Sequence, residues 1–170
     1  MSISDYSKKV YLDSLTESEK LALINYTSHE SGTINHILRK QKNLLDLYES
    51  NIKLIDSALS KFEYKANLIV YRDLILCSSS LYELLKELEK PIVQEKGYYS
   101  CSMVAGAYSN SFNVRMNIIV PDTISPGAYI KHISDRQKEE EYLIKRDTFY
   151  ETVDIQNKED KYYITRRILY

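Results

Sequence analysis

The order of the predicted elements along the chain indicates an α+β fold, because helices come first and β-strands follow. In the first third, apolar residues recur every three to four positions, which is the spacing of one helix face. After Gly97, short runs rich in β-branched and aromatic residues are separated by turn signals. The 170 residues suit one domain, with a helical part over residues 1–61 and a β-rich core over residues 67–170.

Three helices are predicted in the first third. Ser14 or Thr16 can cap the first, which continues to about Tyr26 and has acidic residues in its first turn. The second covers residues 31–40 and the third residues 42–61. The third helix has an apolar stripe that predicts a core-facing surface, made of Leu44, Leu45, Tyr48, Ile52, Ile55 and Leu59.

The remaining elements are predicted to be mostly strands. A buried strand is expected over residues 67–72, and a helix over residues 81–90 ends before Pro91. Further strands are expected over residues 98–103, 114–120, 142–146, 149–155 and 161–170, with a polar turn over residues 156–160.

Composition excludes several classes of function. A formal net charge of -1 predicts no nucleic-acid partner. No apolar run reaches the roughly 18 residues of a membrane span, so we expect no membrane insertion. The two cysteines and three histidines do not have the spacing of metal ligands, which predicts no metal site. The N-terminus lacks the apolar segment of a signal peptide, so either the protein acts where it is made, or a signal was trimmed, or delivery takes another route.

Three short segments carry candidate functional residues. Arg72 ends an apolar strand, Ser100 and Ser102 alternate along a second strand, and Glu139-Glu140-Glu141 leads into a third. Each segment alone is weak: a strand-end arginine is usually ion-paired, a Ser-Cys-Ser run is usually a polar strand face, and a triple glutamate is usually solvated. Their order along the chain is therefore the informative feature.

In that order, an arginine, an aromatic-Ser-x-Ser strand and a Glu-x-Glu strand entry resemble the bacterial arginine-type (R-S-E) mono-ADP-ribosyltransferases. The chain is most similar in pattern to the clostridial Rho-modifying exoenzymes and the enzymatic components of binary actin-modifying toxins. Further segments that match this pattern, from Leu15 to the C-terminus, are Leu15-Thr16-Glu17-Ser18-Glu19-Lys20, Tyr26-Thr27, Ile34-Asn35, Leu38-Arg39, Gly127-Ala128-Tyr129-Ile130 and Tyr142-Leu143-Ile144-Lys145-Arg146.

The resemblance implies helices packed on a mixed, mostly antiparallel core of two sheets, which binds NAD as a substrate without a metal. The absence of a G-x-G-x-x-G motif agrees with a cleft other than a Rossmann site. By resemblance, Glu141 stabilises the ribosyl cation through the ribose 2′-hydroxyl, and Glu139 positions or deprotonates the acceptor. Strand alternation predicts that these two glutamates share a face while Glu140 points away.

The other site residues are carried over in the same way. Ser100 is expected to orient Glu141, with Ser102 supporting it beside the cofactor, and Arg72 to hold the dinucleotide. Asn35 and Arg39, one helical turn apart, are expected to face NAD. Phe112 and Arg115 match a family pair that clamps nicotinamide and phosphate.

The predicted activity is transfer of one ADP-ribose unit to a protein side chain. Glutamate at position 139 favours arginine as the acceptor, with actin or a small GTPase as the candidate target. Alternatives are an asparagine of a Rho-type GTPase, hydrolysis of NAD without a protein acceptor, and an NAD-binding module that has lost catalysis, which the departures Cys101 and Asp73 motivate. Arg136 replaces an aromatic residue of the family loop. We expect a monomer, secreted or delivered as a toxin into a target cell.

Overall fold

The computed structural model describes residues 1–107 and 111–170, apart from the side chain of Lys42. Its helices are α1 (Ile3–Asp13), α2 (Glu17–Asn25), α3 (Ser31–Lys40), α4 (Leu45–Ser60) and α5 (Ser78–Leu88). The strands are β1 (Leu68–Leu74), β2 (Ile92–Glu95), β3 (Tyr99–Ser102), β4 (Val114–Val120), β5 (Gly127–Tyr129), β6 (Glu141–Ile144), β7 (Thr148–Lys158) and β8 (Lys161–Ile168). The chain is therefore α+β, as predicted.

The strands form one sheet in the order β2-β7-β8-β4-β1-β3-β6-β5, and among these described strands only β4 and β8 pair in parallel. A core of two sheets was expected, and the sheet does have two parts. Five strands (β2, β7, β8, β4, β1) join three strands (β3, β6, β5) where Tyr71 of β1 pairs with Ser102 of β3. The two parts of the sheet therefore form one hydrogen-bonded unit.

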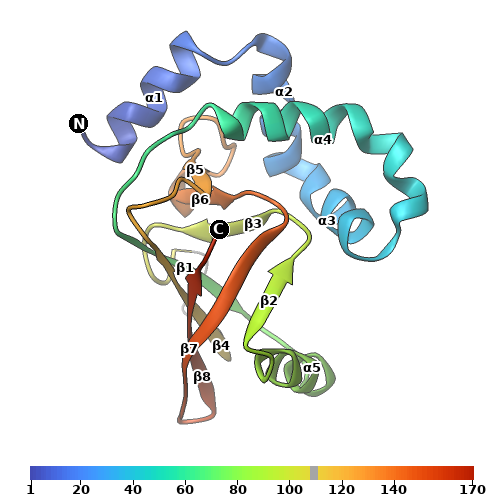
Figure 1. Cartoon of the computed structure of the whole chain (residues 1–170), viewed down its shortest axis with the longest axis vertical. Coiled ribbons are helices and arrows are strands. Elements are labelled where there is room, and N and C mark those ends of the chain that lie inside the picture. The colour runs from blue at the N-terminus through green and yellow to red at the C-terminus, as the bar shows by residue number, and fades with distance from the viewer. Residues whose placement is uncertain (108–110) are drawn as a thin grey trace.

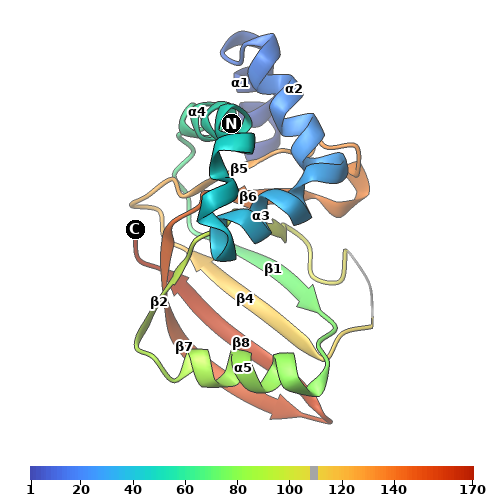
Figure 2. The same cartoon turned by 90° about the vertical axis from the view of Figure 1, so that its right-hand side faces the viewer.

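Two apolar clusters lie on either side of this junction. Helices α1 to α4 gather at one end of the molecule, over β3, β5 and β6 (Figure 1). Their cluster includes Leu23, Ile34, Ile55 and Tyr98. The second cluster lies under α5, which runs across one face of the five-stranded part (Figure 2), and includes Val70, Met116 and Ile164.

Local sequence signals explain the helix ends. The Thr16 side chain accepts a hydrogen bond from the Glu19 N–H, and the Glu19 side chain accepts one from the Thr16 N–H, which forms a capping box at the start of α2. The predicted stripe of α4 packs inward, since Ile52, Ile55 and Leu59 are buried. No helix in the two described segments is long and apolar enough to cross a membrane.

Between α2 and α3 the chain does not break but widens into a π-helical turn over Tyr26–Glu30. A π-helical turn contains one more residue than an α-helical turn, so it changes the direction in which the following side chains point. This turn places α3 with its Asn35 side facing the start of β3, because Asn35 binds the backbone of Tyr98.

Several elements differ from the predictions. Helix α1 and the short strands β2 and β5 were not predicted, and β7 extends to Lys158, into the predicted turn over residues 156–160. That hairpin closes with only Glu159 and Asp160, both at positive φ (51° and 61°), so the two strands stay paired almost to their ends.

Candidate active site

The site is centred on Glu141, the first residue of β6. Its Cα lies opposite Ser102 of β3 in the antiparallel ladder. The Ser100 hydroxyl donates a hydrogen bond of 2.7 Å to Glu141 Oε1. Glu141 is only 4% exposed, so its carboxylate depends on such donors for solvation.

Burial raises the pKa of Glu141 above its ordinary value, and hydrogen bonding by the hydroxyl groups of Ser100 and Ser134 acts in the opposite direction. The nearby charge of Glu139 raises the same pKa further, which places the two carboxylates close together. Ser134 was not among the predicted site residues, because a single serine in a loop has no periodic or motif signal.

The other two residues of the Ser-Cys-Ser run differ in role. Ser102 is buried, and its hydroxyl accepts a hydrogen bond of 3.0 Å from the Val104 N–H, so it supports the turn after β3. Cys101 faces the opposite side of the strand, in the cluster under α5, where burial raises its pKa to about 12. Cysteine in place of the family threonine therefore packs in the core.

Arg72 lies where the two parts of the sheet meet. Its Nη1 donates to the Ser100 carbonyl oxygen at 2.6 Å, and its guanidinium lies 4.6 Å from the centre of the Tyr99 ring. These contacts hold a positive charge next to the strand that carries Ser100. The neighbouring Asp73 points to the other face of β1, where Arg115 binds it, so it does not compete with an anion at Arg72.

Asn35 of α3 joins the helical part to β3. Its side-chain oxygen accepts from the Tyr98 N–H at 2.9 Å, and its amide nitrogen donates to the Tyr26 hydroxyl at 3.0 Å. Gly97 permits this approach, since a Cβ there would lie 2.7 Å from Asn35 Oδ1. Arg39, one turn later, is bound by Glu95 at 2.8 Å.

The Tyr26 hydroxyl reports how close these groups are. Burial raises its pKa most strongly and the Asn35 hydrogen bond lowers it. The carboxylate of Glu141 then raises it, while the guanidinium groups of Arg72 and Arg39 lower it. The charges predicted from the sequence thus surround one buried tyrosine. Tyr26 was predicted as part of a family segment but not as a site residue.

Glu139 is not placed as predicted. It ends a 3-10 turn, Gln137–Glu139, and is followed by Glu140 in the left-handed conformation at φ 49°, so the strand begins only at Glu141. Strand alternation therefore does not relate the two glutamates. Glu139 lies 3.6 Å from Arg136, and burial raises its pKa while Arg136 lowers it. Glu140 binds Tyr129 and Lys131, away from this pair, as expected of a residue outside the chemistry.

Phe112 and Arg115 form a separate cluster. Arg115 binds both carboxylate oxygens of Asp73, at 2.7 and 2.9 Å, and lies 4.1 Å from the Phe112 ring centre. Lys161 and Tyr163 complete this cluster, which contains none of the groups around Glu141. The structure therefore does not bring this pair to the other predicted site residues.

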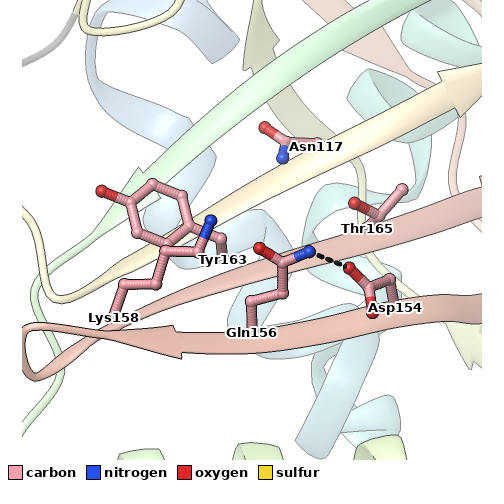
Figure 3. Close-up of a pocket in the computed structure, with 6 residues that line it drawn as sticks. All are labelled: Asn117, Asp154, Gln156, Lys158, Tyr163 and Thr165. Atoms are coloured by element: carbon pink, nitrogen blue, oxygen red, sulfur yellow. Dashed lines mark hydrogen bonds between the residues drawn. The ribbon is translucent and has the colours of Figure 1, made fainter.

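Other hollows lie outside this site. One of about 330 Å³ opens on the face of the five-stranded part that α5 does not cover, lined by polar side chains of β4, β7 and β8 (Figure 3). Its Gln156 and Asp154 are hydrogen-bonded to each other. Among the described residues, no group of three or more histidine, cysteine, aspartate or glutamate side chains is arranged to hold a metal ion.

The arrangement has the parts that a dinucleotide substrate and a developing positive charge require. Two arginines lie near a buried carboxylate that a serine hydroxyl orients, and a second carboxylate lies beside it. The description "ADP-ribosyltransferase exoenzyme" belongs to the family model that matches residues 4–169.

The chain belongs to the ADP-ribosyltransferase exoenzyme family.

Solved structures of this kind resemble the whole chain. Plx2a, an ADP-ribosyltransferase toxin from Paenibacillus larvae, is 25% identical with a TM-score of 0.82, over 99% of this chain and 95% of that chain. An ADP-ribosyltransferase from Clostridium botulinum is 25% identical with a TM-score of 0.79, over 98% of this chain and 94% of that chain. The Clostridium limosum C3 exoenzyme, at 24% identity and a TM-score of 0.80 over 100% and 96%, has the same fold. No functionally curated protein matches in sequence.

As a member of the ADP-ribosyltransferase exoenzymes, the chain is an NAD+-dependent protein mono-ADP-ribosyltransferase. The predicted α+β fold, the family and the enzyme class are thereby confirmed.

Proposed function

We propose that this ADP-ribosyltransferase transfers ADP-ribose from NAD+ to an arginine side chain of a target protein. Glu141 is the residue that stabilises the ribosyl cation, Ser100 orients it, and Glu139 accepts the proton of the acceptor. The observation that carries the proposal is the buried Glu141 carboxylate, bound by Ser100 at 2.7 Å and close enough to Glu139 for the two charges to interact.

NAD+ supplies the ADP-ribosyl group when the bond between nicotinamide and ribose C1 breaks and nicotinamide leaves, neutral, with the bonding electron pair. Positive charge then develops on the ribose, and a fixed carboxylate lowers the barrier by opposing it. The acceptor nitrogen forms the new bond to C1 and loses one proton. Burial raises the pKa of Glu139, which makes it a stronger base than an exposed glutamate.

Arg72 and Arg39 are the proposed partners of the two phosphates. Arg72 has a fixed guanidinium over Tyr99, and Arg39 has an ion pair with Glu95 that a phosphate can replace or share. Asn35 positions the nucleotide from α3. Phe112 and Arg115 keep a place in this proposal only if their segment moves toward NAD+ when it binds, because their cluster lies elsewhere.

Arginine is favoured as the acceptor because a carboxylate at position 139 can bind a guanidinium group and take its proton, as it already binds Arg136 at 3.6 Å. Vis, a fold relative from Vibrio splendidus, has been solved with agmatine, which is a guanidino compound. An asparagine of a Rho-type GTPase is the alternative acceptor. Actin and small GTPases are the candidate targets, in a cell that the protein reaches as a secreted or delivered toxin.

The test is incubation with labelled NAD+ and either purified actin, a purified Rho GTPase or a host-cell lysate, followed by mass spectrometry of the modified peptide. We expect label on arginine, loss of labelling in Glu141→Gln, and loss of transfer with retained NAD+ hydrolysis in Glu139→Gln. The matched control is Glu89→Gln, an exposed glutamate beyond α5. Unchanged labelling by Glu141→Gln contradicts the assignment, and label on asparagine selects the alternative acceptor.

A further inference from the structure

The segment between β5 and β6 makes an unusual set of contacts with Glu141. Ser134, in the middle of this segment, is 2% exposed. Its N–H donates to the Ile130 carbonyl at 3.0 Å, and the Ile130 N–H donates to the Glu141 carbonyl at 2.9 Å. The backbone of the catalytic glutamate and that of Ser134 are therefore bound to the same residue.

The Ser134 side chain connects two further groups. Its hydroxyl oxygen accepts a hydrogen bond of 3.1 Å from the Arg136 N–H. The same hydroxyl hydrogen-bonds the Glu141 carboxylate. A serine hydroxyl has one proton to donate and two lone pairs to accept with, so it can make both contacts at once.

The segment that follows, residues 135–140, is here called the acceptor loop because it carries Arg136 and Glu139. At its far end, Glu140 is held by the Tyr129 hydroxyl and the Lys131 ammonium group, and the Glu140 carbonyl accepts from the Met103 N–H at 2.9 Å. Both ends of the loop are thus fixed to the strands. The Ser134 end is also fixed to the carboxylate that does the chemistry.

We propose that Ser134 is a positioning residue that holds the Glu141 carboxylate and the acceptor loop in one fixed geometry, and that this selects a protein side chain over water as the acceptor. The inference rests on the proposed role of Glu141. Ser100 also binds Glu141, but it does so from β3, where its carbonyl accepts from Arg72. The two serines connect Glu141 to different parts of the site, so their effects are separable.

The distinction follows from the two fates of the ribosyl cation. In transfer, an acceptor nitrogen bonds to ribose C1 and gives its proton to Glu139. In hydrolysis, a water oxygen bonds to the same carbon and its proton passes to solvent. Both reactions need an oriented Glu141, but only transfer needs the acceptor loop in register with it. Losing Ser100 impairs both reactions, and losing Ser134 impairs transfer more than hydrolysis.

The experiment measures two rates for each variant of the full chain: nicotinamide release from NAD+ alone, and label incorporated into total protein of a host-cell lysate. For Ser134→Ala we expect transfer to fall on the order of tenfold more than hydrolysis. For Ser100→Ala we expect the two rates to fall together. Ser134→Thr keeps the hydroxyl and should restore the wild-type ratio. Ser125→Ala is the matched control, since its hydroxyl binds the Phe62 carbonyl outside the site.

A second measurement separates positioning from general loosening of the fold. Because Ser134 lowers the pKa of Glu141, the acid limb of hydrolysis should move to higher pH in Ser134→Ala and return with threonine. If the alanine variant does not fold, Ser134→Cys gives the same comparison, because a thiol of similar size is a weak donor and acceptor.

The outcomes divide cleanly. An equal loss of both rates, or no loss, in Ser134→Ala overturns the proposed role of Ser134 while Glu141→Gln still abolishes both. Retention of both rates in Glu141→Gln instead overturns the proposed function on which the inference rests.

Discussion

The carboxylate of Glu141 is held by hydroxyl groups from two separate segments, while burial and the charge of Glu139 act against its ionisation. At the scale of single residues, this balance sets the pH range in which the enzyme works. Catalysis requires the ionised form, because only a negative charge stabilises a ribosyl cation. A raised pKa therefore moves the acid limb of the rate profile above that of an exposed glutamate, whose ordinary value is about 4.3.

Ser100→Ala tests this balance directly. The lost hydrogen bond stabilised the charged form, so the pKa of Glu141 should rise and the acid limb of kcat/KM for NAD+ should move to higher pH. We expect kcat also to fall, since the carboxylate loses its fixed orientation. The measurement is nicotinamide release across pH, with Ser125→Ala as the control. An acid limb at the wild-type position would show that Ser100 does not act through ionisation.

The residues of the site were predictable to different degrees. Arg72, Ser100 and Glu141 were identified from their order along the chain, and the structure brings them together. The placement of Glu139 on a strand with Glu141 was wrong, because the left-handed Glu140 ends the 3-10 turn just before β6. Ser134 and Glu95 act through contacts made by folding, and the sequence has no local pattern that indicates them.

At the scale of elements, α2 is attached to α4 mainly through Glu19. Its carboxylate binds the Lys61 ammonium group at 2.7 Å and the Ser57 hydroxyl at 2.7 Å, as well as the Thr16 N–H of the capping box. Although burial alone would raise its pKa, these partners lower it from 4.5 to about 2. The charged form of Glu19 is therefore favoured by the folded state.

Glu19→Ala should lower the free energy of unfolding by about 3 kcal/mol near neutral pH, the equivalent of the depressed pKa. Because the folded-state pKa is below the unfolded one, this contribution is complete above about pH 5 and lost as the pH falls toward 2. Urea unfolding at pH 7 and pH 3 measures it. Glu19→Gln, which can still cap the helix, should lose less. A loss independent of pH would assign the effect to packing alone.

The face between α5 and β8 carries an unusual cost. Arg166 is 6% exposed, and within the described residues its Nε and Nη2 atoms have no hydrogen-bond partner, although its guanidinium lies 4.6 Å from the Tyr150 ring centre. Arg166→Met keeps an unbranched apolar stem and should raise the free energy of unfolding by about 1–3 kcal/mol. Thermal unfolding checks this. A strong loss of stability would mean that a glutamate of α5 binds Arg166 in solution.

Most elements could be predicted because their signals are local. Helix α3 and strand β4 have the predicted bounds, since periodicity and the flanking Pro121 define them. Helix α1 was missed because it buries only Ser7 and Val10 and therefore lacks an apolar stripe. Strands β2 and β5, of four and three residues, exist only through pairing with β7 and β6, so their own residues contain too little signal.

At the scale of the whole molecule, the proposed NAD+ contacts come from three units. Asn35 and Arg39 belong to the helical part, Arg72 to the five-stranded part, and Ser100 and Glu141 to the three-stranded part. The two parts of the sheet meet where Tyr71 pairs with Ser102. The fold class was predictable from the order of helices and strands. This junction was not, because strand pairing over such separations depends on the assembled core.

A ligand that contacts all three units should stabilise them together. We expect NAD+ at about 100 times its Kd to add about 2.7 kcal/mol to the free energy of unfolding. The Tm of Glu141→Gln, which does not consume NAD+, should rise accordingly in thermal melts. Adding Arg72→Met should remove most of this rise, whereas Arg115→Met should leave it. A rise that is abolished by Arg115→Met instead would return the Phe112–Arg115 cluster to the nucleotide site.

The π-helical turn over Tyr26–Glu30 makes the spacing of this helix sensitive to single-residue insertions and deletions. Each residue of an α-helix advances by about 100° around its axis. Deleting one residue of the turn would let α2 run directly into α3 as regular helix, and Asn35 and Arg39 would then rotate away from Gly97 and Glu95. A relative one residue shorter here could keep every residue of the arginine–serine–glutamate signature and still lose its grip on the nucleotide. Alignment gaps in this segment are therefore as informative about activity as substitutions in the signature itself.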